Sequence, residues 1–440
     1  MSRMTNAYDK LIEKVTRWFD YNVITLVAVI IYKSLLDVIY CVYIGGSYSF
    51  FSVNISVINI INGWIITLIM SYFINEFCKQ ECCSSVFLII LNIIYFIPIT
   101  TYCGYGGGSS SFLFGAIIYW LFLSILQCRI PTITIRTKCR HVISLDKFFS
   151  ILIILSSVVI IYLWAKYTDF RLLTNFFDVY DARSEAAEYE LPMLLSYLQQ
   201  LLSIIVPILI LLALMKRKYV MLLWLLALTY INFSFAGHKS VIFFPVLLIG
   251  GYLFYRRKMV RLIIPGAILL EVAAFIEQWF SSSYLTSYIF RRQGLVLAQL
   301  SEYYYRFFLS HPTDLFRSGI MGKLGFDSVY DQQLGRVIGN NFETQVVNCN
   351  NGLLADVWAN MGWIGLIIMP IILIVCLRLW DCVSFKIEMR VTISLVLYYA
   401  MQFANSSWST VLLSHGFIIM CLILLIFPKA KTDSVLVAKE

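Results

Sequence analysis

The side chains best suited to chemistry lie in one long polar stretch, from Glu277 to Cys349, of an otherwise apolar chain. Guanidinium groups form paired hydrogen bonds with phosphate and carboxylate oxygens, so a group of arginines indicates an anionic ligand. Six acidic residues balance six basic ones here, so the indication depends on where the cations stand rather than on net charge. The basic residues are Arg291, Arg292, Arg306, Arg317, Lys323 and Arg336, and the stretch also holds His311.

Residues 287–312 have the pattern of an amphipathic helix that ends at Pro312. At 100° per residue, Arg291, Glu302 and Arg306 fall within an arc of about 60°. One interpretation is that this face presents guanidinium groups to a lipid diphosphate. The other is an interfacial helix in which Glu302 and Arg306 simply form an i, i+4 ion pair. The helix alone favours neither.

Aromatic rings and histidines add two further possibilities. Tyr303 and Tyr304 can stack on sugar rings, although such residues are also typical of any membrane interface. His238, His311 and His415 are expected at one depth near the outer membrane surface, which suits proton transfer. A lone histidine is more often structural, and that interpretation remains open for each of them.

The segment NCNNGLLADVWANMGWIGL (348–366) carries polar residues where a membrane helix should be turning apolar. Asn350, Asn351, Asp356 and Asn360 lie in this region. Polar groups that are buried need hydrogen-bond partners. We therefore expect these side chains to line a cavity or to pack against the long polar stretch.

The elements that must position these residues are membrane helices. The chain is 60% hydrophobic and 13% charged, whereas soluble domains contain about 25% charged residues. Its continuous apolar runs predict an all-α, polytopic membrane protein with a single membrane domain over residues 1–440. We count twelve spans, near 23–44, 50–75, 85–102, 111–128, 148–166, 193–215, 219–236, 240–255, 260–276, 351–377, 391–408 and 409–427.

Placing the N-terminus in the cytoplasm puts most of the 34 basic residues in cytoplasmic loops, including Arg378 in a loop at 378–390. The C-terminus is then cytoplasmic too, and the shorter loop 167–192 and the long loop 277–350 lie outside. This distribution explains the net charge of +9 without a nucleic-acid partner. Lys33 and Asp37, four apart in the first span, are best interpreted as a structural ion pair.

The sequence contains no motif that indicates a bound cofactor or metal. The sequence has no P-loop, no dinucleotide-binding glycine motif, no HExxH and no paired-cysteine zinc spacing. We therefore expect neither a cofactor nor a metal. A disulfide between Cys103 and Cys349, both expected outside, is left open.

Four segments together resemble a known family. They are DVYDARSEA (178–186), GHKS (237–240), RRQGLVLAQLSEYYYRFFLSHP (291–312) and NGLLADVWANMGWIG (351–365). With the predicted topology, they are similar to the O-antigen polymerases, the oligosaccharide repeat-unit polymerases (Wzy) of the bacterial inner membrane. The fifteen-residue gap from Arg306 to Gly322 fits a spacing found in some members, whereas the shorter ten-residue gap is absent.

The resemblance implies metal-independent glycosyl transfer between undecaprenyl-diphosphate-linked oligosaccharides at the periplasmic face, and a polysaccharide chain-length regulator as partner. Arginines would neutralise the leaving diphosphate. The implied diphosphate-binding residues are Arg291, Arg292 and Arg306, assisted by Arg183 and Lys239. The implied base is His311, His238 or Glu302, and Tyr303, Tyr304 and Asp356 would contact sugars.

Other classes of protein remain possible. An O-antigen ligase shares the architecture and the outside arginines. A lipid-linked oligosaccharide flippase should place several charges inside its spans, and here those are sparse: Lys33, Asp37 and Glu271. A membrane acyltransferase fits poorly, because His141 is the only histidine expected on the cytoplasmic side.

Overall fold

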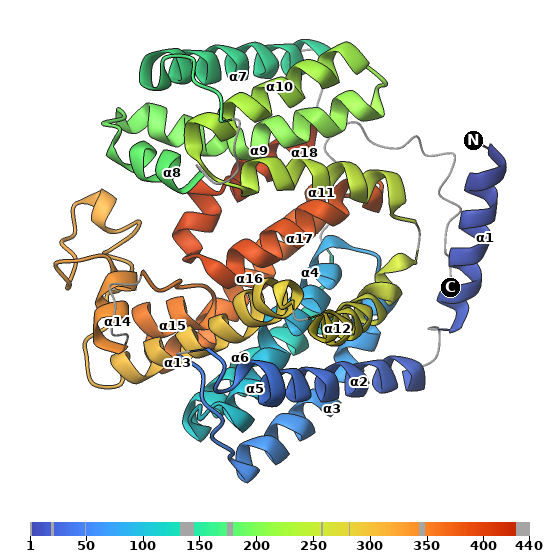
Figure 1. Cartoon of the computed structure of the whole chain (residues 1–440), viewed down its shortest axis with the longest axis vertical. Helices are drawn as coiled ribbons and strands as arrows, with labels where there is room; N and C mark the ends of the chain where they lie inside the picture. The colour runs from blue at the N-terminus through green and yellow to red at the C-terminus, as the bar shows by residue number, and fades with distance from the viewer. Residues whose placement is uncertain are drawn as a thin grey trace. The chain divides into compact units, whose positions relative to one another are not determined.

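The computed structural model describes residues 2–18, 22–48, 50–132, 145–173, 179–256, 258–280, 282–342 and 348–427. These residues are almost all helical and contain no β-strand (Figure 1). The contacts divide the chain into two compact units. Unit 1 comprises 1–133, 256–381 and 399–410, and unit 2 comprises 134–255, 382–398 and 411–440.

Membrane-embedded architecture is confirmed by the lengths of the helices. Within the described ranges, nine helices are long and apolar enough to cross a bilayer. Three further predicted spans correspond to the helices Ser240–Phe254, Met389–Asn405 and Thr410–Ile426, which are shorter. The count of twelve and the orientation stay predictions, and the lysine-containing tail after Phe427 lies outside the described residues. The nine helices are Val23–Ile44, Val57–Lys79, Cys83–Tyr105, Ser110–Arg129, Asp146–Thr168, Met193–Met215, Tyr219–Ala236, Met259–Trp279 and Gly362–Val383.

A central helix of unit 1, Cys83–Tyr105, is the most completely buried of the candidate spans. It consists of α4, a π-helical turn at Asn92–Phe96, and α5. Asn92 stabilises that turn, because its amide donates to the carbonyl of Leu88 and accepts a 2.9 Å hydrogen bond from Trp120 Nε1. The helices of unit 1 include α2 (Asn22–Ile39), α3 (Val57–Lys79), α4 (Cys83–Leu91), α5 (Ile97–Tyr105), α6 (Ser110–Arg129), α12 (Ile263–Trp279) and α16 (Gly362–Val383).

A buried ion-pair network joins α16 to the start of α4. Arg378 is only 3% exposed and lies 3.1 Å from Asp381, so it belongs to the helix and not to the predicted loop at 378–390. The Asp381 carboxylate accepts hydrogen bonds from the backbone N–H and the hydroxyl of Ser84, at 2.9 and 2.5 Å. It therefore satisfies a donor that the N-terminus of α4 would otherwise leave unpaired.

The predicted helix at 287–312 exists but packs into the interior of unit 1. It comprises a π-helical stretch, Thr286–Leu295, and α13, Val296–Phe308, which ends before Pro312. Leu297, Glu302 and Tyr304 are buried because α13 packs along α15 (Leu354–Asn360) and against α5. One face of the helix is therefore buried within the unit, while Arg292 and Arg306 on other faces are exposed. A further short helix, α14 (Leu334–Phe342), packs against α13.

Unit 2 is built around α9 and α10, with α7 against both (Figure 1). A small hydrophobic cluster that includes Val179, Phe233 and Val241 fastens α8 to the turn after α10. Residues 174–178 of the shorter outside loop, including Asp178 of its motif, lie outside the described residues. The helices are α7 (Leu145–Thr168), α8 (Val179–Glu188), α9 (Met193–Met215), α10 (Tyr219–Ala236), α11 (Ser240–Phe254), the first part of α17 (Met389–Asn405) and α18 (Phe417–Ile426).

Candidate functional site

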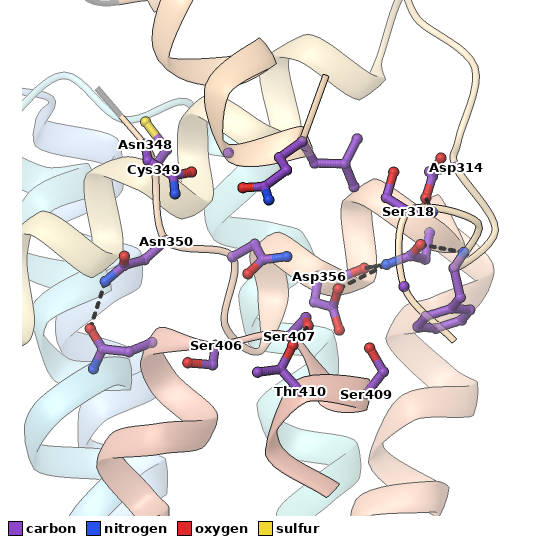
Figure 2. A pocket seen from close by; sticks show the side chains of 18 residues that line it. Asp314, Ser318, Asn348, Cys349, Asn350, Asp356, Ser406, Ser407, Ser409 and Thr410 are labelled. Carbon is purple, nitrogen blue, oxygen red and sulfur yellow. Dashed lines mark hydrogen bonds between the residues drawn. The ribbon is translucent and has the colours of Figure 1, made fainter. Parts of the chain in front are cut away.

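A polar cavity of about 360 Å³ lies within unit 1 (Figure 2). Two carboxyl groups, six amides and five hydroxyls line it, and none of these lining residues, all of them described, is basic. Such a surface suits a ligand rich in hydroxyl groups rather than a bare anion. The lining residues are Asp314, Phe316, Ser318, Gly319, Gln333, Leu334, Gly335, Asn348, Cys349, Asn350, Asn351, Asp356, Asn360, Asn405, Ser406, Ser407, Ser409 and Thr410.

A close backbone crossing shapes one wall of this cavity. A Cβ atom on Gly352 would lie 2.2 Å from the carbonyl of Ala404, so only glycine fits there. The next residue, Leu353, has a φ of 38°, and its N–H donates a 3.1 Å hydrogen bond to the carbonyl of Phe403. A non-glycine residue in this conformation is strained by roughly 1–3 kcal/mol. The strained turn brings the beginning of α15 against the end of α17.

The crossing joins two amide side chains at the cavity wall. Asn350 Nδ2 donates to Asn405 Oδ1 at 2.8 Å, as Figure 2 shows. Asn405 is held in turn by a 2.8 Å hydrogen bond from its Nδ2 to the carbonyl of Met401. The amide pair therefore has a fixed orientation before any ligand enters.

Asp356 is the titratable residue of the cavity with a perturbed pKa. Its side chain is fully buried, between the 314–318 loop and the 406–410 turn. One carboxyl oxygen accepts from Asn360 Nδ2 and the other from the backbone N–H of Trp408, both at 2.8 Å. Burial raises the pKa of Asp356 to about 7, although these hydrogen bonds oppose the shift. A buried carboxyl group that titrates near neutral pH is suited to general acid–base catalysis.

Asp314, the other acid of the cavity, has a structural role. Its carboxylate accepts hydrogen bonds from the N–H of Ser318 at 2.6 Å and from the hydroxyl of Ser328 at 3.1 Å. Its own N–H donates to the carbonyl of Ala359 at 2.8 Å. Asp314 therefore folds its loop onto α15.

Two of the predicted site residues, Glu302 and Arg306, form an ion pair on α13. Arg306 Nε lies 2.7 Å from a carboxyl oxygen of Glu302, which also accepts a 3.0 Å hydrogen bond from the N–H of Ser109. Burial raises the pKa of Glu302. The half-exposed Arg306 also donates to the carbonyl of Gly107 at 3.1 Å. The pair thus fastens the glycine-rich loop 106–109 to α13, and it is the i, i+4 ion pair of the second interpretation of this helix.

Arg291 and Arg292, also predicted to bind diphosphate, lie about four turns before Arg306 and do not line the cavity. The guanidinium group of Arg291 stacks on Tyr48 with 4.3 Å to the ring centroid and donates to the Ser287 hydroxyl at 3.1 Å. Arg292 is exposed. A diphosphate that bound Arg291 would therefore have to compete with an aromatic contact.

The three histidines expected at one depth are divided between the units: His311 belongs to unit 1, and His238 and His415 belong to unit 2. His311 is exposed and stacks on Phe307 with 3.9 Å between ring centroids. Its Nδ1 atom lies 2.9 Å from the carbonyl oxygen of Phe307. These contacts cap the end of α13 and do not bring the ring into the cavity.

The two tyrosines predicted to contact sugar differ in exposure. Tyr303 is partly buried and stacks on Phe342 of α14 with 4.7 Å between centroids. Tyr304 is fully buried, and its hydroxyl donates to the carbonyl of Cys349 at 3.2 Å. In this arrangement Tyr304 positions a residue of the cavity wall and offers no exposed ring face.

A second cavity, of about 310 Å³, lies in unit 2 and brings together Arg183 and His238, with Gln199 also in its lining. The approach depends on Gly237, whose φ is 62° and where a Cβ atom would lie 2.8 Å from the backbone nitrogen of Arg183. Burial, and secondly the charge of Arg183, lowers the pKa of His238. Lys239 is exposed beside this cavity but does not line it.

Sequence reasoning missed one wall of the main cavity, to which the run 405–410 contributes five lining residues. The run NSSWST (405–410) lies where the last two predicted spans meet, and the sequence suggests only a tight hairpin there, from Asn405 to Ser409. The sequence does contain a signal for this wall, because five residues of the run have hydroxyl or amide side chains between two apolar segments. The structure shows that this run faces Asp356, through the hydrogen bond from Trp408.

No protein-family model, curated protein or solved structure matches the chain. Over the part of the chain that the structure describes, no group of three or more His, Cys, Asp or Glu side chains is placed to hold a metal ion. Cys103 is a buried free thiol, so it forms no bridge with Cys349. Function is therefore inferred from the geometry of the two cavities and their neighbours.

Proposed function

We propose that the protein is a membrane glycosyltransferase that joins lipid-linked oligosaccharide repeat units into a polysaccharide. The observation that carries this proposal is the polar cavity around Asp356. Its volume of about 360 Å³ is near the lower end of the range of small-molecule sites, roughly 300–1,000 Å³. Amide and hydroxyl groups that point inward from several segments suit the hydroxyl groups of a sugar.

Asp356 is the proposed general base for the acceptor sugar. Its ionised carboxylate takes the proton of the acceptor hydroxyl while that oxygen attacks the anomeric carbon of the donor. The bond from the anomeric carbon to the diphosphate breaks, and the diphosphate leaves with the electron pair. The donors from Asn360 and Trp408 orient the carboxylate for this step.

The arginines keep their proposed role as the neutralising groups for the diphosphate. Arg306 is the best placed of them in unit 1, because its guanidinium group is half exposed while Glu302 beneath it is buried. An incoming diphosphate would replace the contact to the carbonyl of Gly107 and keep the guanidinium group oriented by Glu302.

Deletion of the gene in a lipopolysaccharide-producing host tests this proposal against its nearest alternative. A polymerase deletion leaves lipid A–core carrying one repeat unit on a gel of surface glycans. An O-antigen ligase deletion leaves lipid A–core with none, and that result would replace the proposal. A polymerase would also be expected to associate with a chain-length regulator in the cytoplasmic membrane, with its site toward the periplasm.

A lipid-linked oligosaccharide transporter is the second candidate, because the candidate spans bury ionisable side chains, three of them in α2 and α12. Lys33, Asp37 and Glu271 are each less than a tenth exposed. Ionisable residues at membrane depth are common on transport pathways. Loss of a transporter would leave lipid-linked units inaccessible to a glycan-modifying enzyme added to spheroplasts, whereas loss of a polymerase would leave them accessible.

A further inference from the structure

Lys33 and Asp37 of α2 form a complete ion pair inside unit 1. Lys33 Nζ lies 2.5 Å from Asp37 Oδ1, and Lys33 and Asp37 are 1% and 6% exposed. Thr101 of α5 bridges them, because its hydroxyl accepts from Lys33 at 3.0 Å and donates to the same Asp37 oxygen at 2.7 Å. The ammonium group also lies over the rings of Trp64 and Tyr105, at 5.6 and 6.0 Å. The positive charge of Lys33 is therefore already matched.

Glu271 of α12 has no such match. It is completely buried, and neither of its carboxyl oxygens has a hydrogen-bond partner among the residues that the structure describes. It packs toward α2, where Asp37 is close enough to interact with it electrostatically. Asp37 Oδ2 is also without a partner in the described part of the chain. The hydroxyl of Tyr32, which also faces Glu271 from α2, donates to the carbonyl of Ile93 at 3.0 Å.

The charge balance of this cluster determines what it can bind. Two carboxyl groups and one ammonium group leave one excess negative charge in an apolar interior if all three ionise. An uncompensated buried charge costs several kcal/mol, so the cluster needs one further positive charge. Hard metal ions take six or more oxygen ligands, and the three carboxyl oxygens without a partner in the described part of the chain cannot supply them. A proton needs only one oxygen.

We propose that Glu271 is an intramembrane proton-binding site whose carboxyl group carries an exchangeable proton beside the Lys33–Asp37 ion pair. The bound proton removes the excess charge while the ion pair stays ionised. Release of the proton requires water or another base to reach Glu271, which the packing of α12 on α2 prevents in this arrangement. The site thus offers a membrane protein a means of linking a proton to movement of α12, and it does not depend on glycosyl transfer.

Glu277 supplies a matched control on the same helix. Its carboxylate accepts hydrogen bonds from the hydroxyl of Ser282 at 2.9 Å and from the N–H groups of Tyr284 and Leu285, both at 2.7 Å. These donors favour the ionised form of Glu277. The two glutamates of α12 should therefore differ in protonation at the same pH.

Infrared spectroscopy of the purified full chain in lipid nanodiscs tests the site. The difference spectrum between wild type and Glu271→Gln at pH 8 should contain the carbonyl-stretch band of a protonated carboxylic acid in an apolar setting. The difference spectrum between wild type and Glu277→Gln should not contain it. Replacing Asp37 by Asn removes a like charge beside Glu271, so the band should then vanish at a pH lower by roughly one unit. A Glu271→Gln difference spectrum with no such band would overturn the proposal.

A second measurement needs no variant, in case Glu271→Gln fails to fold. A hydrophobic carbodiimide modifies protonated carboxyl groups that are exposed to an apolar phase. Mass mapping of treated wild-type protein should find the adduct on Glu271 and not on Glu277. Modification of Glu277 with Glu271 unmodified would count against the proposal, whatever the outcome of glycan assays.

Discussion

Replacement of Asp356 by Asn separates a catalytic role from a structural one. At pH 8 the variant should lose glycosyl transfer without losing stability, whereas in acid it should be less stable than wild type. Asparagine has the same shape and keeps one oxygen to accept a hydrogen bond. Either Asn360 or the N–H of Trp408 then loses its acceptor. A buried donor left unpaired costs about 1–3 kcal/mol. The variant should therefore be less stable than wild type in acid, by about that amount.

The stability of the wild-type protein, in contrast, should depend on pH through Asp356. Because burial raises the pKa of Asp356 from 3.8 to about 7, the folded state holds a proton that the unfolded state loses. Stability therefore falls as pH rises from about 3.8 to about 7 and is level above that. At 1.36 kcal/mol per pH unit, the loss is at most about 4 kcal/mol. Asparagine does not titrate, so the variant lacks this decline.

The stability curves of the two proteins should consequently cross between pH 4 and pH 7. Thermal unfolding of purified protein, followed by tryptophan fluorescence at several pH values, measures the crossing. At pH 8 the variant should be at least as stable as wild type, yet glycosyl transfer should fall by roughly 10²–10⁴-fold, since a general base is lost. The wild-type transfer rate should rise with pH through about 7, because only the ionised carboxylate accepts the proton.

Asp331→Asn is the matched control, because Asp331 is an exposed aspartate of the same polar stretch outside the cavity lining. It should leave both the transfer rate and the difference in stability between pH 4 and pH 8 unchanged. Full polymer length on a glycan gel with Asp356→Asn would refute the catalytic role. A constant stability difference between wild type and Asp356→Asn across this pH range would refute the raised pKa.

Three further substitutions test the supports of the site. Gly352→Ala should destabilise unit 1 by more than about 3 kcal/mol and lower its unfolding temperature, because the added Cβ would meet the carbonyl of Ala404 at 2.2 Å. Arg306→Ala should destabilise by about 1–3 kcal/mol, because the buried Glu302 loses its cation, and adding Glu302→Gln should recover much of that loss in thermal unfolding. Gly237→Ala should be strained at a φ of 62°, and accelerated limited proteolysis of the loop before α9 would report the displacement of α8.

Much of the fold follows from apolar run length. Each of the twelve predicted runs contains helix, because a continuous apolar stretch has no other way to satisfy its backbone in lipid, although the run 351–377 is divided into α15 and α16. Arg378 shows the limit of this reasoning. A charge near the end of an apolar run was assigned to a loop, whereas the partners Asp381 and Ser84 allow the helix to continue past it. Those partners lie on two helices, and helical periodicity carries no information about a contact with a helix almost 300 residues away in the chain.

The site was harder to predict for the same reason. Asp356 was recognised from a polar residue at the mouth of an apolar run, which is a local signal. The opposite wall, from Asn405 to Thr410, is brought there by the close contact of Gly352 with Ala404. The sequence does not indicate which backbone segment a glycine will contact. Glu271 likewise looked like an isolated charge. Its significance depends on Asp37, which lies on another helix and already has a partner.

Under the proposed function, the absence of cations from the described cavity lining and the position of Arg306 would divide the recognition of a lipid-linked saccharide into two parts. Tyr304 and Arg306 are about 200° apart on α13, since successive residues turn by 100°. Tyr304 holds the cavity wall through Cys349, and Arg306, with Glu302, holds the glycine-rich loop on the other side. A sugar bound beside Asp356 and a diphosphate bound at Arg306 would therefore contact opposite sides of one helix. Arg306 would then bind the diphosphate of the lipid-linked acceptor, which a whole repeat unit separates from the reacting hydroxyl, so substitutions in the cavity should change the selection of sugars while substitutions at Arg306 change the affinity for the acceptor.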